Sequence, residues 1–344
     1  MLAVCKVEPG EDGIEICRRE PRDPGPGEIR LKVAAAGICG TDMQIYHWAP
    51  RMARRMALPR TLGHEVSGTV DAVGPGVEAP AVGHRVALES HIYCGVCRPC
   101  RLGNAHLCTD TAYPGIDIDG AFAEHVTVPA RIAWEIPPAM GFETAAMMEP
   151  FGIAVHAALA GGGVAGRSVL INGCGPIGLM CVAACRALGA LTVIACDVNE
   201  LRLKTAGEMG ADLCVDAKLH SAAEAAMQAT GGSGVDVAIE FSGSEPGFNA
   251  AFDALAKGGD FRLVGAPPAA IPVDFTRWLL KCPQMQNIHG RRIWDTWQRA
   301  SELVAANAVD LGPIRSHVLP LSEARRGFAL ILAGEAVKPL LIPD

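Results

Sequence analysis

SVLINGCGPIG, residues 168–178, is the stretch that decides the fold. An apolar strand at 168–171 runs into three glycines, Gly173, Gly175 and Gly178, and a helix begins near Pro176. Glycines at this spacing permit a tight turn and let the backbone approach a pyrophosphate, which then sits on the positive end of the helix. The stretch therefore predicts a dinucleotide site in a parallel α/β sheet. The plainer alternative, in which the glycines only allow close packing of helix on sheet, stays open here.

The next strand ends in an acidic residue, Asp197, nineteen residues after Gly178. A carboxylate at this place accepts hydrogen bonds from a ribose 2′-hydroxyl and repels a 2′-phosphate. The sequence therefore favours NAD over NADP. Arg202 argues the other way, because an arginine near this strand end can accommodate a phosphate.

The rest of the second half alternates strands and helices from about residue 151. We expect helices at 176–188 and 200–209 and strands at 191–196, 213–215, 235–241, 261–264 and 286–289. Such alternation is typical of a parallel sheet with right-handed crossovers. It predicts an α/β fold with a Rossmann-type, doubly wound sheet.

The first 150 residues follow another pattern, with short strands separated by glycine, proline and aspartate. Examples lie at 29–34, 66–73, 85–88 and 123–128. This pattern predicts a mostly β, antiparallel and partly barrel-like domain. We expect a helix at 294–306 and the tail at 318–342 to return to this first domain.

Length and composition fit a two-domain enzyme and exclude several other classes. The chain has 344 residues, half of them hydrophobic, and a formal net charge of −7. This charge excludes a general nucleic-acid-binding surface, and no uncharged segment reaches the roughly 20 apolar residues of a membrane span. The first twenty residues contain no apolar signal segment, so we expect a cytoplasmic protein. Its 13 cysteines should then be reduced, and clustered ones are better metal ligands than disulfides.

Four cysteines, Cys94, Cys97, Cys100 and Cys108, lie within fifteen residues. Four thiolates at this spacing can complete a tetrahedral shell around one zinc ion, which leaves no position for a substrate. We therefore predict a structural zinc site. The spacing alone also admits an iron–sulfur cluster or four free thiols, and the pattern of the other motifs along the chain is the reason to prefer zinc.

Three scattered residues form a less specific candidate: Cys39 in Gly-Ile-Cys-Gly-Thr-Asp, His64 in Gly-His-Glu, and Glu149 in Met-Glu-Pro. A thiolate, an imidazole and a carboxylate make a mixed zinc shell that can keep one position open, as a catalytic site needs. Singly, each residue would more often serve packing, and sequence spacing alone does not bring the three together.

In their order along the chain, segments 37–42, 63–65, 94–108 and 173–178 resemble the zinc-containing medium-chain alcohol dehydrogenase family. Segments 41–48, 91–94, 150–156, 197–200 and 290–297 are most similar to the branch of that family that oxidises L-threonine. The resemblance implies a GroES-like catalytic domain of residues 1–151 and 292–344 and an NAD-binding domain of residues 152–291. It also implies hydride transfer from a secondary alcohol to NAD, here from L-threonine to give 2-amino-3-ketobutyrate, in a homotetramer.

The same resemblance assigns roles to individual residues. It implies a catalytic zinc on Cys39, His64 and Glu65, with Glu149 as a further ligand or as a relay carboxylate beside the metal. With the four-cysteine site this makes two zinc ions per chain. Besides the three glycines, the implied NAD contacts are Ile177, Asp197, Arg202, Val264, Gly265, Ala266, Ile288 and His289.

Two positions depart from the family pattern. The family's proton relay runs through a hydroxyl, Thr41 here, to a histidine three residues on, where this chain has Gln44, whose amide cannot carry a proton at neutral pH. His47 or His91 could take that place, or the relay could end in water; His91 is also a candidate substrate contact. The second departure is Ile153, where similar threonine dehydrogenases carry asparagine. The alternatives are a polyol or sugar dehydrogenase of the same superfamily and a catalytically silent NAD-binding regulator.

Overall fold

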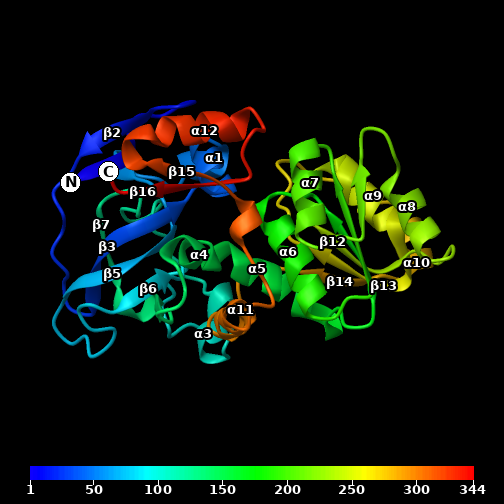
Figure 1. The fold of residues 1–344 in the computed structure, drawn as a ribbon, viewed down its shortest axis with the longest axis horizontal. Helices are drawn as coiled ribbons and strands as arrows, with labels where there is room; N and C mark the ends of the chain where they lie inside the picture. The colour runs from blue at the N-terminus through cyan, green and yellow to red at the C-terminus, as the bar shows by residue number, and fades with distance from the viewer. The chain divides into compact units, whose positions relative to one another are not determined.

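The computed structural model describes all 344 residues and divides them into two compact units (Figure 1). Unit 1 comprises Met1–Glu149 and Arg315–Asp344, and unit 2 comprises Pro150–Ile314. The helix α11 (Asp295–Ala305), which the sequence placed with the first domain, groups with unit 2. The loop before it is tied to α5 (Met148–Leu159), because the carbonyl oxygen of Gly290 lies 2.8 Å from Nδ1 of His156. The functional division into residues 1–151 with 292–344 and residues 152–291 stays a prediction.

Unit 2 is built on one six-stranded sheet in which every pairing is parallel. The strands run in the order β11–β10–β9–β12–β13–β14. Because β9 lies between β10 and β12, the direction of winding reverses at this point, which is the mark of a doubly wound sheet and confirms the predicted fold class. The strands are β9 (Ser168–Asn172), β10 (Thr192–Asp197), β11 (Leu213–Asp216), β12 (Val235–Glu240), β13 (Leu255–Leu263) and β14 (Gln284–Asn287).

Helices cover both faces of this sheet, with α6 and α7 on one side and α8 and α9 on the other (Figure 1). The central strand β9 is apolar on both faces, since Val169, Leu170 and Ile171 are fully buried, as a strand covered on two sides requires. The helices are α6 (Pro176–Ala187), α7 (Glu200–Glu208), α8 (Ala222–Ala229), α9 (Glu245–Ala254) and α10 (Phe275–Lys281), with short η3 (Ala160–Gly162) and η4 (Gly312–Ile314). None of the helices combines the length and the apolar character that crossing a membrane would need.

Unit 1 is mostly β, as predicted. A seven-stranded sheet has the order β15–β16–β3–β5–β6–β8, with β7 also paired to β3, and a smaller sheet has the order β2–β1–β4. Every pairing is antiparallel except that of β15 with β16. The strands are β1 (Leu2–Lys6), β2 (Ile14–Arg18), β3 (Glu28–Gly37), β4 (Arg60–Thr61), β5 (Glu65–Val73), β6 (Arg85–Leu88), β7 (His125–Pro129), β8 (Ala133–Glu135), β15 (Arg315–Pro320) and β16 (Lys338–Ile342).

Short helices close the ends of these strands. They are α1 (Gly40–Tyr46), α2 (Pro50–Ala53), α3 (Arg98–Arg101), α4 (Phe142–Ala146), α12 (Ala324–Leu332), η1 (Ala105–Leu107), η2 (Ala130–Ile132) and η5 (Leu321–Glu323). The strand register decides what meets at one sheet end. Gly37, the last residue of β3, pairs with Glu65, the first of β5, and on its other side with Leu340 of β16. Segments distant in sequence therefore converge just beyond Gly37.

Candidate metal and dinucleotide sites

Cys39, His64 and Glu65 come together at this end of the β3–β5 ladder. One ligand atom from each lies within 4.8 Å of the others. Because Gly37 pairs with Glu65, the residues just after β3 and just before β5 must lie beside each other. Backbone pairing thus explains how a thiol, an imidazole and a carboxylate far apart in sequence form one cluster, which we call the open cluster.

The chain before His64 turns through a conformation that glycine provides. Gly63 has φ of +92°, and a Cβ atom placed there would lie 2.3 Å from Cδ1 of Phe122. No side chain fits in that space, and the left-handed backbone region disfavours other residues as well. The Gly-His-Glu segment is therefore a local requirement for aiming the imidazole into the cluster.

Asp42, which is fully buried, supports two members of the open cluster. Its Oδ2 accepts a hydrogen bond of 2.8 Å from the backbone amide of Cys39, and its Oδ1 lies 4.0 Å from Nδ1 of His64. A separation of 4.0 Å is too long for a hydrogen bond, so Asp42 acts on His64 through its charge. Burial raises the pKa of Asp42, and the neighbouring His64 opposes that rise.

Lys338, from β16, holds the third member. Its Nζ lies 2.5 Å from Oε2 of Glu65 and donates a hydrogen bond of 3.0 Å to the carbonyl oxygen of Ile38. Both charged side chains are at most 1% exposed. Burial raises the pKa of Glu65, and the ammonium of Lys338 acts against that rise. The pair compensates part of the negative charge of the cluster.

The electrostatics of the open cluster favour a bound cation. Burial by itself lowers the pKa of His64, but the thiolate of Cys39, together with Asp42 and Glu149, outweighs burial and raises that pKa to about 10. His64 Nδ1, Asp42 Oδ1 and Glu65 Oε1 are buried without a hydrogen-bond partner. Unpartnered buried polar atoms are rare and need an explanation such as an ion. A sulfur, nitrogen and oxygen donor set of this kind fits Zn²⁺ with one position open.

Glu149 belongs to the same group of charges. It is 5% exposed, stands in the first turn of α5, and raises the pKa of both His64 and Glu65. The distances of its carboxylate oxygens from the other donors leave it outside the three-residue cluster itself. Its role as a ligand or as a relay carboxylate stays a prediction.

The predicted relay residues lie on and beyond helix α1. Thr41 is half-buried in its first turn, whereas Gln44 is exposed. His47 caps the end of the helix, is 49% exposed, and has Nδ1 at 3.3 Å from Oε1 of Glu11. His47 is therefore in contact with solvent, which suits the outer end of a proton path.

His91 has a different environment. Its side chain is 5% exposed, and Nδ1 lies 2.7 Å from Oε1 of Glu89, which also accepts a 2.8 Å hydrogen bond from the His91 amide. The ring packs edge-on against Tyr113. The carboxylate and the aromatic ring together fix the orientation of this imidazole.

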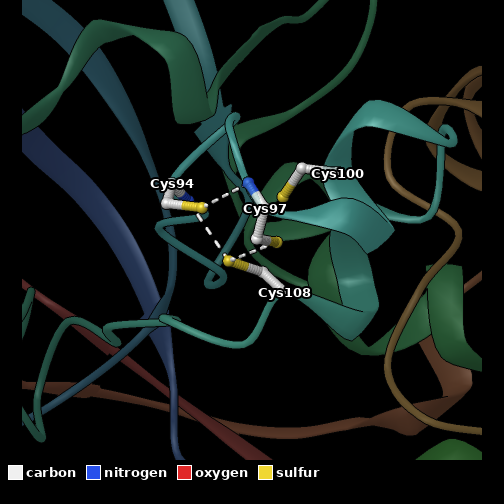
Figure 2. Close-up of side chains that lie close together, drawn as sticks. All are labelled: Cys94, Cys97, Cys100 and Cys108. Carbon is white, nitrogen blue, oxygen red and sulfur yellow. Dashed lines mark hydrogen bonds between the residues drawn. The ribbon is translucent and has the colours of Figure 1, made fainter.

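The four cysteines predicted to bind a structural zinc form a second, separate cluster, which we call the closed cluster. Figure 2 shows the sulfurs of Cys94, Cys97, Cys100 and Cys108 converging on one point, and all lie within 4.8 Å of one another. The Cys97 amide donates to Cys94 Sγ and the Cys94 amide to Cys108 Sγ, each over 3.3 Å. Such donors stabilise thiolates rather than thiols.

The pKa of two of the four thiols, Cys97 and Cys108, is lowered by backbone amides, whereas burial and the neighbouring Cys97 raise that of Cys100. Backbone amides of Cys100 and Thr109 lower the pKa of Cys97 to about 6. Four sulfur donors without a histidine or carboxylate leave no place for substrate. The four sulfurs therefore lie together as the spacing predicted, and the cluster fits a closed, structural zinc site; its occupation by zinc stays a prediction.

The glycine-rich turn lies at the carboxyl edge of the parallel sheet in unit 2. It lines a cavity of about 560 Å³ to which Gly173, Gly175, Asp197 and Arg202 contribute. A Cβ atom on Gly178 would lie 2.0 Å from the carbonyl oxygen of Gly173, so only glycine allows this close turn. A cradle of this form, at the N-terminus of a twelve-residue helix without a side-chain cap, fits a pyrophosphate.

Asp197 also lines that cavity. It is 8% exposed; Oδ2 accepts a 2.6 Å hydrogen bond from the Cys174 amide, and Oδ1 accepts one of 2.9 Å from the Asn199 amide. Arg202 Nη1 lies 3.9 Å from Oδ2. The arginine beside Asp197 therefore faces a carboxylate, which already compensates its charge.

The remaining predicted NAD contacts lie along the same sheet edge. The amides of Val264 and Gly265 each donate to the carbonyl oxygen of Glu240 over 2.9 Å, and the Ile288 amide donates to Leu263 over 2.8 Å. Sequence reasoning missed three buried charged residues beside these sites: Asp42, Lys338 and Glu240. Asp42 stands next to the predicted Thr41, but only the folded register reveals the other two.

Known proteins resemble this chain over its full length. Residues 25–138 match the alcohol dehydrogenase GroES-like domain, and residues 176–306 match the zinc-binding dehydrogenase domain. An L-threonine 3-dehydrogenase of Thermococcus kodakarensis is 39% identical over 100% of this chain and 98% of its own length. One of Bacillus subtilis is 41% identical over 92% and 91%. An Escherichia coli structure described as a short chain alcohol dehydrogenase complexed with NADH is 29% identical, with a TM-score of 0.91 over 99% of both chains.

Proposed function

The chain belongs to the zinc-binding alcohol dehydrogenase family, and from that premise we propose that it oxidises L-threonine to 2-amino-3-ketobutyrate with NAD. Membership confirms the resemblance that the motifs predicted and makes the protein a zinc-dependent oxidoreductase. The observation that carries the proposed chemistry is the open cluster of Cys39, His64 and Glu65, whose donor atoms lie within 4.8 Å of one another. Its choice of substrate is supported by the threonine dehydrogenases that share about 40% of its residues over nearly the whole chain.

The open cluster would hold the catalytic zinc and the closed cluster the structural one. When bound, the catalytic zinc supplies Lewis acidity to the substrate hydroxyl, and NAD accepts the hydride. Asp42 holds the Cys39 backbone by a hydrogen bond and acts on His64 through its charge, and Lys338 keeps Glu65 in place. These buried partners fix the ligands before substrate arrives, which limits the reorganisation that the reaction requires.

The proton of the substrate hydroxyl needs a path to water. We propose that the Thr41 hydroxyl accepts this proton first and that His47, which is half-exposed beside Glu11, passes it to solvent. Gln44 cannot replace a histidine, because an amide does not titrate at neutral pH. Glu149 and the His91–Glu89 pair remain the candidates for relaying a proton or for holding the substrate ammonium.

NAD binding is assigned to unit 2. The turn of Gly173, Gly175 and Gly178, with Ile177 at the start of α6, would hold the pyrophosphate, and Asp197 would hold the adenosine ribose. The Asp197 carboxylate supports a preference for NAD over NADP, since it would repel a 2′-phosphate. Segments 264–266 and 288–289 would complete the contacts.

Two further assignments concern the working state of the enzyme. We propose a homotetramer that acts on a small-molecule alcohol in the cytoplasm. The cytoplasmic assignment is supported by the thirteen cysteines, none of which forms a disulfide.

A substrate panel tests the proposed function. L-Threonine, sorbitol and 2,3-butanediol are offered to the zinc-loaded enzyme with NAD and separately with NADP. We expect the highest kcat/KM for L-threonine with NAD. A preference for sorbitol or the diol would instead establish a polyol dehydrogenase, the alternative within the same superfamily. Binding of NADH without turnover of any alcohol would indicate a silent regulator.

A further inference from the structure

Glu240, the last residue of β12, has a buried carboxylate whose partners are all uncharged. It is 1% exposed and takes part in no ion pair. Oε1 accepts hydrogen bonds from the Ser242 amide (2.8 Å), from the Ser242 hydroxyl and, more weakly, from Asn172 Nδ2 (3.5 Å). Oε2 accepts one from the Gly243 amide (3.1 Å). Burial of an anion is costly unless it is satisfied in this way, so the loop and the carboxylate stabilise each other.

The loop that Glu240 holds, residues 241–244, occupies a key place at the sheet edge. It follows β12 at the point where the winding direction reverses, and ligands of doubly wound sheets bind at that point. The neighbouring loops press against it: a Cβ on Gly173 would lie 2.6 Å from the Ser242 amide nitrogen, and one on Gly265 would lie 2.4 Å from that of Gly243. Phe241, Ser242 and Ser244 line the 560 Å³ cavity.

All four amides of this loop are already bonded within the protein. The Phe241 amide donates to the carbonyl oxygen of Asn172 (2.8 Å), and the Ser244 amide donates to Ser242 Oγ (3.2 Å). Those of Ser242 and Gly243 donate to Glu240. The loop therefore has no backbone donor left for an anion.

The start of α6, which borders the same cavity at Gly175, differs. Its N-cap residue, Gly175, provides no side-chain hydrogen bond, and the first-turn amides of a helix have no partner within the helix. These amides can receive a phosphate oxygen, which those of the 241–244 loop cannot.

Resting on the proposed NAD binding, we infer that Glu240 is a positioning residue for the dinucleotide. Glu240 accepts hydrogen bonds from the Ser242 and Gly243 amides and so holds the 241–244 loop against β12. The loop then offers a nucleoside only hydrogen-bond acceptors and van der Waals contacts. The pyrophosphate is left to the N-terminus of α6. Glu240 acts through the loop and touches neither substrate nor reacting atoms.

The variant Glu240→Gln tests this inference. Glutamine keeps the shape of the side chain but has only one acceptor oxygen. Its NH2 group would therefore face a backbone N–H that now donates a hydrogen bond to the carboxylate. We expect the Kd of NADH, measured by fluorescence titration of the zinc-loaded protein, to rise about tenfold. The KM for NAD should rise in parallel, while kcat at saturating NAD stays within about twofold and zinc content is unchanged. The inhibition constant of inorganic pyrophosphate, used as a competitor of NADH, should stay at its wild-type value.

Asp260→Asn is the matched control. Asp260 is another buried carboxylate of unit 2, but it lies in β13 and pairs with Arg167 and Arg262, away from the cavity. This variant should lower the melting temperature and leave the Kd of NADH unchanged. If Glu240→Gln behaves in the same way, Glu240 is only a stabilising residue and the inference fails. An equal rise in the pyrophosphate constant would also overturn it.

If Glu240→Gln does not fold, a milder variant tests the same inference. Ser242→Ala removes one hydroxyl donor to Glu240 and also the acceptor of the Ser244 amide, so both changes loosen the loop and the Kd of NADH should rise about threefold. An unchanged value would overturn the inference. Failure of the wild-type protein to bind NADH would instead refute the proposed function, which keeps the two tests distinct.

Discussion

Unit 1 contains two cysteine-bearing clusters, and they differ in how the chain assembles them. The closed cluster takes four sulfurs from Cys94–Cys108, so local turns suffice to form it. The open cluster takes one sulfur, one imidazole and one carboxylate from the ends of two strands, and needs Asp42 and Lys338 behind them. Local assembly gives a saturated metal shell that stabilises a lobe. Long-range assembly gives an unsaturated shell in a buried, charged pocket, which is what chemistry on a substrate requires.

The largest expected effect separates the two clusters by activity. Cys39→Ser should remove the catalytic zinc and lower kcat by at least about 1,000-fold, since the Lewis acid is worth several kcal/mol. The Kd of NADH should stay within about twofold of wild type, because the glycine-rich turn is untouched. Steady-state kinetics and fluorescence titration measure the two quantities. Retained turnover would show that the open cluster is not catalytic.

Cys100→Ser should have the converse effect. Loss of one thiolate removes the closed zinc and should lower the melting temperature by about 5–10 °C, because structural zinc contributes directly to folding stability. The kcat per folded molecule should change less than about threefold. Differential scanning calorimetry with parallel kinetics tests this. A fall in kcat as large as that of Cys39→Ser would show that the closed cluster takes part in turnover.

Asp42→Asn tests whether the buried charge beside His64 supports zinc binding at the open cluster only. Because Asp42 stands behind His64, its loss of charge should weaken zinc at the open cluster by about 10–100-fold. Zinc at the closed cluster should be unaffected in competition with a chelator. Asp110→Asn is the control, since only the backbone amide of Asp110 contacts Cys108 and its side chain is exposed. Equal weakening of both sites by Asp42→Asn would contradict the assigned role.

The smallest expected effect concerns the pH at which the closed cluster releases its zinc. The pKa of Cys97 is lowered to about 6, so its thiolate is present above that pH and is lost as the pH falls through it. In the Cys39→Ser background, which carries only the closed zinc, release to a chromogenic chelator should therefore accelerate below about pH 6. Asp110→Asn in that background is the control: its side chain is exposed and only its backbone amide contacts the cluster, so it should release zinc over the same pH range. A release midpoint above about pH 8 in the background variant would contradict the assigned pKa.

Much of the fold could be predicted, because its signals are local. The glycine turn, the strand before it and the alternation after it predicted the parallel sheet, and the spacing of Cys94 to Cys108 predicted the closed cluster. The open cluster needed a family resemblance, since the strand register that pairs Gly37 with Glu65 is not visible in the sequence.

The supporting charges could not be predicted at all. Lys338 lies at the end of the chain and reaches Glu65 only because β16 pairs beside β3. Glu240 reads as an ordinary strand end until its loop is seen to fold back on it. Helix α11, which the sequence assigned to the first domain, groups with unit 2, since an amphipathic pattern does not state which surface a helix covers; its functional domain stays a prediction.

Stepwise removal of zinc tests whether the open cluster holds a catalytic ion and the closed cluster a structural one. Zinc content, initial rate with L-threonine and folded fraction are followed together while a chelator is added to the wild-type enzyme. Two zinc ions per chain are expected, whichever leaves first: turnover should fall in step with loss of zinc from the open cluster while the folded fraction is unchanged, and loss of zinc from the closed cluster should lower stability while the folded molecules keep their turnover. One zinc per chain, or turnover that survives loss of zinc from the open cluster, would contradict these roles.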